Sequence, residues 1–311
     1  MTVASGGNRE DLHFDIIGDE KTQARVSSMV ERISQSETGY GVLKTAADEG
    51  YSIGMEFVLG ANGGCSKEKK LIVLNPLSSD DELVGVLVHE ARHAGQFSRG
   101  EYDASDDRRA RTDTLKTGIM RTRAVEADAQ ATAIQALAEL TETGDVRPMQ
   151  AFSRANEAIG KAFNRALYEQ EDALESGSAR TAAFMAWYEN DAIKKAYDQA
   201  YQVEMMQRRA ESGENVNDTY QNSQSAEKIV KDLCLSSDGS CYFTQSPSVL
   251  EGERFVNVDM KTAKELNDLM KTAAPSHKDH PDNALPFKPA VSSGKMAGMT
   301  PLAARRMRMG R

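Results

Sequence analysis

Two histidines and a glutamate in the segment His89-Glu90-Ala91-Arg92-His93 have the types and the spacing of a metal site. His89 and His93 are four residues apart, so on a helix their side chains lie one above the other on the same face. Two neutral imidazoles at that spacing can bind one tetrahedral zinc ion. Glu90 follows the first histidine and points beside the metal, where a general base for a water molecule belongs. The segment therefore predicts a hydrolytic zinc site.

The residues around this motif predict the helix that must carry it. Ser79-Asp80-Asp81-Glu82 has the pattern of a capping box, which starts a helix that we expect to run to about Phe97. The motif lies in an apolar part of that helix, so the alternative of two surface histidines with a solvated glutamate fits poorly. Residues 51–59 and 70–74 read as strands on either side of a turn-rich loop. We therefore expect a small antiparallel sheet before the motif helix.

A third protein ligand is needed if one metal position is to stay open for water. Glu126 is the best candidate, because it lies on an alanine-rich helix expected over about 122–140. Its neighbours at helical spacing are alanines and a leucine, so its carboxylate falls on the buried stripe. A buried charge costs several kcal/mol unless it is paired or binds a metal. The alternative is an ion pair with Arg121 or Arg123.

The combined pattern resembles a known class of enzymes. His-Glu-x-x-His, followed some thirty residues later by a Glu on a second helix, resembles the gluzincin branch of zinc metallopeptidases. More narrowly, His-Glu-Ala-Arg-His-Ala-Gly-Gln with Glu-Ala-Asp-Ala-Gln-Ala is similar to an uncharacterised bacterial family described only as metallopeptidases. The match covers about residues 50–140. The longer metzincin pattern is excluded, because Gln96 and Arg99 stand where it has Gly and His.

The resemblance implies a zincin-like α+β fold and hydrolysis of a protein or peptide substrate. Zn²⁺ would be held by His89, His93 and Glu126, and Glu90 would move the proton of the attacking water. In many gluzincins an Asp four residues after the ligand Glu orients the first histidine. Here Gln130 stands at that position and Asp128 lies two residues after Glu126, so the orienting residue is left open.

An oxyanion formed at the scissile carbonyl needs a donor besides the metal. Tyr188 is our candidate for that donor, with Tyr102 as the second choice. The alternative for each is a tyrosine of the core or the surface, whose hydroxyl has no part in the reaction.

The rest of the chain reads as mostly helical. We expect a loop over 98–120, helices over 151–174, 179–209 and 226–233, a strand over 255–258, and a helix capped by Thr262 and Glu265. These elements divide the chain into a zincin-like metallopeptidase domain over 1–210, a small C-terminal segment over 211–274 and a disordered basic tail over 275–311.

Composition narrows the classes of function. A net charge of -9 argues against a nucleic-acid binder. The longest apolar run, residues 83–88, is too short for a membrane span, and the first twenty residues lack the pattern of a secretory signal. With only three cysteines, a reduced cytoplasmic setting fits best. Cys234 and Cys241 flank a hairpin-like segment, so two alternatives stay open: a disulfide bond between them, or two free thiols.

The tail over 275–311 holds seven Lys or Arg residues against two Asp residues. Its arginine-rich end could bind an acidic partner, and it is similar to the ends of some bacterial translocated effectors. A plain basic tail is the favoured alternative. His277 and His280 have a metal-like spacing but sit among prolines, so solvated linker is the better interpretation. The rival for the whole chain is an inactive zincin-like scaffold that binds a protein partner or senses a signal.

Overall fold

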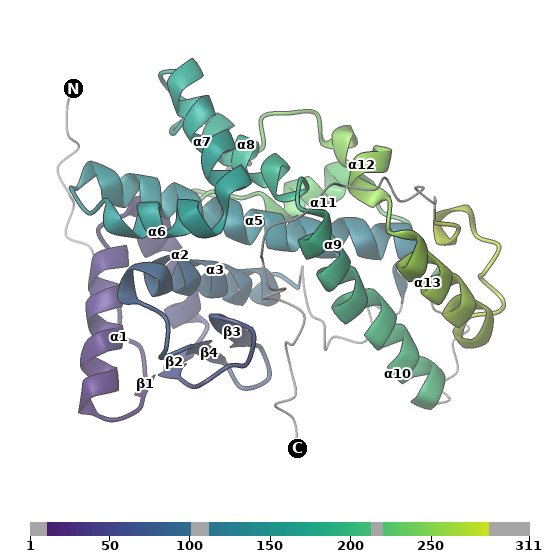
Figure 1. Ribbon diagram of the computed structural model, residues 1–311, viewed down its shortest axis with the longest axis horizontal. Coiled ribbons are helices and arrows are strands. Elements are labelled where there is room, and N and C mark those ends of the chain that lie inside the picture. The colour runs from purple at the N-terminus through teal and green to yellow at the C-terminus, as the bar shows by residue number, and fades with distance from the viewer. Residues whose placement is uncertain (1–10, 101–111, 213–219, 286–311) are drawn as a thin grey trace.

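The structure, a computed structural model, describes residues 11–100, 112–212 and 220–285. A small four-stranded sheet lies beside a mostly helical remainder, so the predicted α+β class is confirmed (Figure 1). The strands are β1 (Ile16–Ile17), β2 (Ser52–Met55), β3 (Gly63–Ser66) and β4 (Leu71–Leu74). The helices are α1 (Glu20–Ile33), α2 (Glu37–Asp48), α3 (Asp80–Ser98), α5 (Leu115–Glu142), α6 (Arg147–Ala155), α7 (Glu157–Glu169), α8 (Ser178–Trp187), α9 (Asp191–Asp198), the π-helical turn η1 (Gln199–Val203), α10 (Glu204–Ser212), α11 (Ala226–Leu233), α12 (Glu253–Val256) and α13 (Met260–Ala273), with short 3-10 turns η2 (Pro247–Glu251) and η3 (Pro281–Asn283).

The sheet is mixed, which corrects the expectation of an antiparallel one. Its strand order is β1-β2-β4-β3; β1 and β4 both pair with β2 in parallel, and only β3 and β4 are antiparallel. The strand that forms the hairpin with β4 is Gly63–Ser66, whose first two residues belong to the expected turn-rich loop over 60–64. β3 therefore occupies one edge of β4, and β2 pairs in parallel with the other edge. Because β3 consists of glycines and small side chains, it shows no hydrophobic strand pattern in the sequence.

The motif helix α3 is buried on nearly every side. It packs against α2, α5 and α6 as well as against the sheet, and the side chains from Leu83 to Phe97 are buried with the exception of Val86. A helix that is apolar around most of its circumference belongs in a core. In Figure 1, α3 lies between the sheet and α5. Any polar group on its middle turns is therefore shielded from water.

Helix α5 connects two hydrophobic clusters. Its central and C-terminal turns belong to the main core with α3, whereas Leu115 and Ile119 in its first turns belong to a second cluster with residues of α10 and α13. It begins at Leu115 after the N-cap Thr114, so the expected loop over 98–120 is wrong for its last residues. Residues 101–111 lie outside the described part of the chain.

Other helices are shorter than expected. The helix expected over 151–174 is divided at Asn156 into α6 and α7. The one expected over 179–209 is interrupted between α8 and α9. The strand expected over 255–258 is wrong, because its buried residues begin in the short helix α12. Helix α13 starts at the N-cap Asp259 rather than Thr262, because the Asp259 carboxylate accepts from the backbone N–H of residues 261 and 262.

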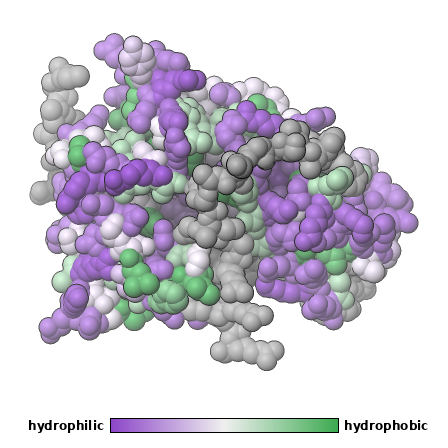
Figure 2. Space-filling view, in the orientation of Figure 1, coloured by the Kyte–Doolittle hydropathy of each residue, from purple (hydrophilic) through white to green (hydrophobic). Residues whose placement is uncertain are grey.

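The predicted helix over 226–233 is confirmed as α11, which packs against α5. No described helix is both long enough and apolar enough to cross a membrane. Hydrophilic side chains cover most of the face in Figure 2, with an apolar group over the loops of the small sheet. Phe57, Leu59 and Leu77 in the loops after β2 and β4 are among the exposed large apolar residues. The predicted domain boundaries stay a prediction.

Candidate metal centre

Helix α3 places both histidines on one side. The Ser79 hydroxyl accepts from the Glu82 backbone N–H, and the Glu82 carboxylate accepts from the Ser79 backbone N–H, so the predicted capping box is confirmed. Ten residues into the regular helix, His89 and His93 lie one turn apart. Their Nε2 atoms are 3.0 Å apart, and both side chains are buried. The helix thus presents two imidazole nitrogens to a single point.

Glu126 completes the group from the neighbouring helix α5. Its Oε2 atom lies 3.5 Å from His89 Nε2 and 3.6 Å from His93 Nε2, and the side chain is fully buried. Donor atoms bound to one tetrahedral metal at about 2.0–2.1 Å are about 3.3–3.4 Å apart. The three separations fall on either side of that value. The three side chains therefore fit a metal ion, and they form a potential ligand group among the described residues.

The arginines considered as partners of Glu126 are engaged elsewhere. Arg121 donates to Asp113 at 3.0 Å and to Gln224 at 2.6 Å. Arg123 makes a two-bond pair with Asp198, at 3.0 and 2.5 Å. These contacts favour the ligand role of Glu126 over the ion-pair alternative.

Gln96 is hydrogen-bonded to the second histidine. Its amide nitrogen donates to the Val125 carbonyl at 3.1 Å and to the Asp128 carboxylate at 2.8 Å, so both amide hydrogens are used. The Oε1 atom, 2.7 Å from His93 Nδ1, is then an acceptor. It follows that His93 carries its proton on Nδ1 and leaves Nε2 available to a metal.

Asp128 is the centre of a buried polar network. Arg92 donates to both of its oxygens, at 2.7 and 3.0 Å, and Tyr242 donates to it at 2.9 Å. Burial by itself raises the pKa of Asp128, but Arg92, the Arg180 charge and the Tyr242 hydrogen bond together hold that pKa below its usual value. Asp128 therefore stays ionised and accepts from Gln96, whereas the residue that would orient the first histidine stays open, because His89 Nδ1 has no hydrogen-bond partner among the described residues.

Sequence reasoning missed most of this network. Gln96 and Arg92 are polar residues on an otherwise apolar buried helix, and Gln96 lies three residues after a ligand, so a signal for both was present. Tyr242 lies in a different segment, far from the motif along the chain, and nothing in its local sequence marks it. Gln130, the alternative to Asp128, is only partly buried.

Glu90 lies beside the ligand group and against the edge strand of the sheet. It is buried, with 5% of the residue exposed. Strand β3 approaches so closely at Gly63 that a Cβ atom there would lie 3.3 Å from Glu90 Cγ. The position next to a ligand on the same helix matches the one predicted for a general base. Strand β3 therefore packs against the Glu90 side chain.

Tyr188 lies in a cluster of aromatic rings. Its ring contacts are with Phe184, Trp187 and Phe255, at centroid distances of 5.8, 5.1 and 4.8 Å. Burial raises the pKa of its phenol well above the ordinary value, so the hydroxyl keeps its proton. The described contacts do not include the ligand group, and the oxyanion role of Tyr188 stays a prediction. Tyr102 lies outside the described residues.

The weaker metal and thiol candidates have other partners. His277 Nε2 lies 3.0 Å from the Gln221 amide, and His280 Nδ1 accepts from the Asp282 backbone N–H. Cys234 and Cys241 are free thiols, so the bridge considered between them is absent. The arginine-rich end of the chain lies outside the described residues.

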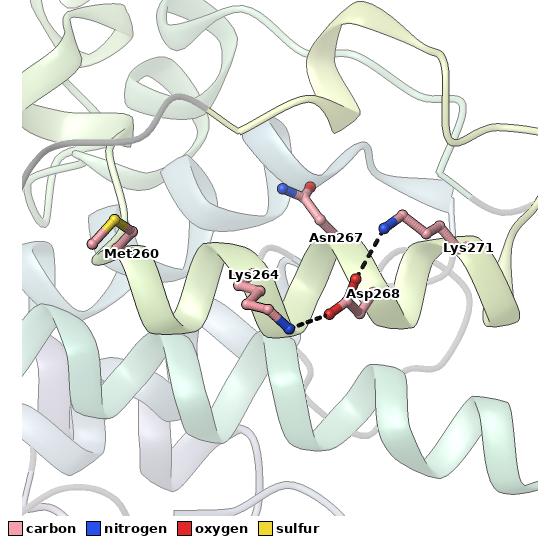
Figure 3. Close-up of a pocket in the computed structure, with 5 residues that line it drawn as sticks. All are labelled: Met260, Lys264, Asn267, Asp268 and Lys271. Atoms are coloured by element: carbon pink, nitrogen blue, oxygen red, sulfur yellow. Dashed lines mark hydrogen bonds and ion pairs between the residues drawn. The ribbon is translucent and has the colours of Figure 1, made fainter.

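A surface hollow on α13 lies apart from this group. Met260, Lys264, Asn267, Asp268 and Lys271 line it (Figure 3). Asp268 accepts from both lysines, which lowers the pKa of its carboxyl group to about 2. Side chains from one turn to the next of a single helix supply this lining, and such charge pairs are typical of a solvated helix face. The hollow gives no reason to place chemistry there.

Comparison with known families agrees with the geometry. Residues 12–244 match the model of a family described as "Putative metallopeptidase family (DUF6782)". The chain belongs to this family. No curated protein and no solved structure gives a significant match. The matched range includes the motif helix, Glu126 and Tyr242, so family membership supports a metallopeptidase at the coarse level and leaves the details of the site to its geometry.

Proposed function

We propose that this protein is a zinc-dependent peptidase whose metal is held by His89, His93 and Glu126. The observation that carries the proposal is the triangle of two imidazole nitrogens and one carboxylate oxygen, with sides of 3.0, 3.5 and 3.6 Å. Two histidines and one carboxylate are a donor set that suits zinc and leaves one position open. Family membership supports the peptidase class, and a gluzincin-like arrangement is our interpretation of the spacing.

When bound, zinc supplies a Lewis acid that makes water acidic near neutral pH and polarises a carbonyl. Glu90 is the proton carrier in this proposal. It accepts a proton from the attacking water and returns the proton to the leaving amine after the amide bond breaks. Burial beside β3 keeps its carboxylate in one place, and Gln96 keeps His93 in the tautomer that can bind a metal. The substrate class is a protein or a peptide.

The rival proposal, an inactive scaffold with a structural metal, has less support. A metal with a purely structural role has no use for a carboxylate one residue after a ligand. Glu90 lies at that place and is buried beside the ligand group. The geometry therefore favours catalysis.

Metal content of purified protein tests the proposal. Elemental analysis should give about one zinc per chain in wild type and in Glu90→Gln, and none in Glu126→Ala. His277→Ala is the matched control, because it removes a histidine outside the ligand group. Peptide-library hydrolysis should fall by about 10²–10⁴ in Glu90→Gln while zinc is kept.

Each outcome has a defined meaning. Wild type that stays metal-free after preparation in zinc without chelators contradicts the metal site. Wild type that binds zinc but cleaves nothing in the library, with Glu90→Gln identical to it, supports the scaffold instead. Zinc retained in Glu126→Ala would show that the third ligand is wrongly assigned.

A further inference from the structure

We propose that Gln96 and Tyr242 are positioning residues for the metal, and that the segment after α11 is thereby part of the metal site. Gln96 acts on His93 directly, and Tyr242 acts on Gln96 through Asp128. The inference rests on the proposed metal site, and it adds to that site residues that neither bind the ion nor touch a substrate.

The first link joins His93 to Gln96. The Gln96 oxygen accepts from His93 Nδ1–H at 2.7 Å, and both residues are fully buried. Such a bond fixes the tautomer and the ring orientation of a histidine ligand and raises its basicity. His89 Nδ1, by contrast, has no hydrogen-bond partner among the described residues. Of the two histidines, it is therefore His93 whose ring is oriented by a hydrogen bond.

The second link joins Gln96 to Asp128. The amide donates to Asp128 Oδ2 at 2.8 Å, which prevents the amide from turning its nitrogen toward His93. Asp128 is itself fixed by three further hydrogen bonds. Arg92 grips the carboxylate with two bonds, and this fork geometry is the most specific that a guanidinium offers. The Tyr242 hydroxyl supplies a further donor.

The third link joins this network to a distant segment. Besides Asp128, Arg92 donates to the carbonyls of Leu233 and Leu235, at 2.8 and 2.9 Å. Leu233 is the last residue of α11, where helix carbonyls lack intrahelical partners, and Leu235 lies just beyond the C-cap Cys234. Tyr242 follows in a turn that closes with its backbone N–H on the Cys234 carbonyl, at 2.9 Å. The segment from 233 to 242 therefore holds Arg92 and Asp128 from two directions.

The family match covers this segment as well. It runs to residue 244 and so includes α11 and Tyr242 beyond the ligand helix α5.

Zinc affinity is the first test. Competition with a chromophoric chelator gives the Kd of wild type, Gln96→Leu and Tyr242→Phe. We expect Gln96→Leu to bind zinc about 10–100-fold more weakly. Tyr242→Phe, which removes one hydroxyl two hydrogen bonds farther from the histidine, should bind about 3–10-fold more weakly.

Tyr201→Phe is the matched control. Tyr201 is also buried, and its hydroxyl is shielded from water, but it lies in η1 and stacks on Tyr197. Unfolding midpoints of the metal-free variants report any general loss of stability. Equal zinc affinity in wild type, Gln96→Leu and Tyr242→Phe would overturn the inference, and so would an equal loss in Tyr201→Phe and Tyr242→Phe.

The histidine tautomer is a second readout that needs no metal. The chain has five histidines, so ¹⁵N-histidine labelling gives a spectrum that single substitutions can assign. Metal-free wild type should show a slowly exchanging Nδ1–H proton on His93, which Gln96→Leu loses and Tyr201→Phe keeps. A His93 proton on Nε2 in wild type contradicts the inference. Wild type that shows the Nδ1–H signal but binds no zinc would refute the proposed function while confirming the Gln96 bond.

Discussion

Replacing Gly63 by alanine tests how closely β3 must approach the motif helix. A Cβ atom at this position would lie 2.5 Å from Val86 Cγ1, 3.0 Å from the Val73 carbonyl oxygen and 3.3 Å from Glu90 Cγ. Valine in a helix has one strongly preferred rotamer, and the carbonyl belongs to the paired strand β4, so neither neighbour yields easily. Gly64, the next residue in the strand, has nothing within 4 Å of such a Cβ.

These contacts set the expected free energies. Overpacking a buried site by a methyl group costs about 1–3 kcal/mol. Glycine to alanine lowers the entropy of the unfolded chain, which stabilises the fold by about 0.4–1 kcal/mol where the site is compatible. That gain is common to Gly63→Ala and Gly64→Ala. The difference in unfolding free energy between the two variants should therefore equal the overpacking cost of about 1–3 kcal/mol, with Gly63→Ala the less stable.

Guanidinium unfolding of both variants measures that difference. Because the added methyl group also presses on Glu90, hydrolysis by Gly63→Ala should fall while its zinc content stays at the wild-type level. Gly63→Ala with the stability and turnover of Gly64→Ala would refute the close approach of β3. Loss of zinc in Gly63→Ala would show that the strand supports the ligands themselves.

Three further predictions follow from buried groups. The pKa of Asp128 is held below 3.8 in the folded protein. The stability that the ionised carboxylate contributes is therefore present above pH 3.8 and is lost as the pH falls through the folded-state pKa. Below pH 3.8, unfolding midpoints should fall more steeply in wild type than in Asp128→Asn. Arg123→Leu leaves Asp198 buried without its two-bond partner and takes a donor from the Phe255 and Asn257 carbonyls, so guanidinium unfolding should show a loss of about 3–5 kcal/mol, and an unchanged midpoint would contradict it. If Tyr188 donates to the oxyanion, Tyr188→Phe should lower turnover by about 10²–10³ with zinc retained; unchanged turnover would assign the hydroxyl to the aromatic cluster.

The parts of the fold set by local patterns could be predicted from the sequence. The capping box at Ser79 and the apolar strands β2 and β4 each carry their own signal. The mixed pairing of the sheet could not be predicted, because β3, which lies between β2 and β4 in the chain, carries no hydrophobic signal of its own. The breaks in the long helices, as at Asn156, could not be predicted either, because tertiary packing determines them more than helix propensity does.

The residues of the candidate site likewise fall into those that the sequence predicts and those that it does not. His89 and His93 follow from spacing on one helix, and Glu126 follows from the cost of a buried carboxylate on another. The side chains that orient the ligands could not be assigned, because they meet only in three dimensions. Asp128 was considered, but its link to His93 passes through Gln96 and its anchor is Tyr242. A sequence separation of more than a hundred residues hides that contact from any local pattern.

The contacts of Arg92 with the Leu233 and Leu235 carbonyls have a consequence for the order in which the protein is made. All three metal ligands have been synthesised once the ribosome passes Glu126, but Tyr242 comes much later. At about 5–20 residues per second, that interval lasts about 6–23 s. During this time the nascent chain carries the ligands without the side chain that completes their support. A chain that ends before residue 242 therefore lacks the hydroxyl that donates to Asp128, and on the proposed function it binds zinc more weakly than the longer chain.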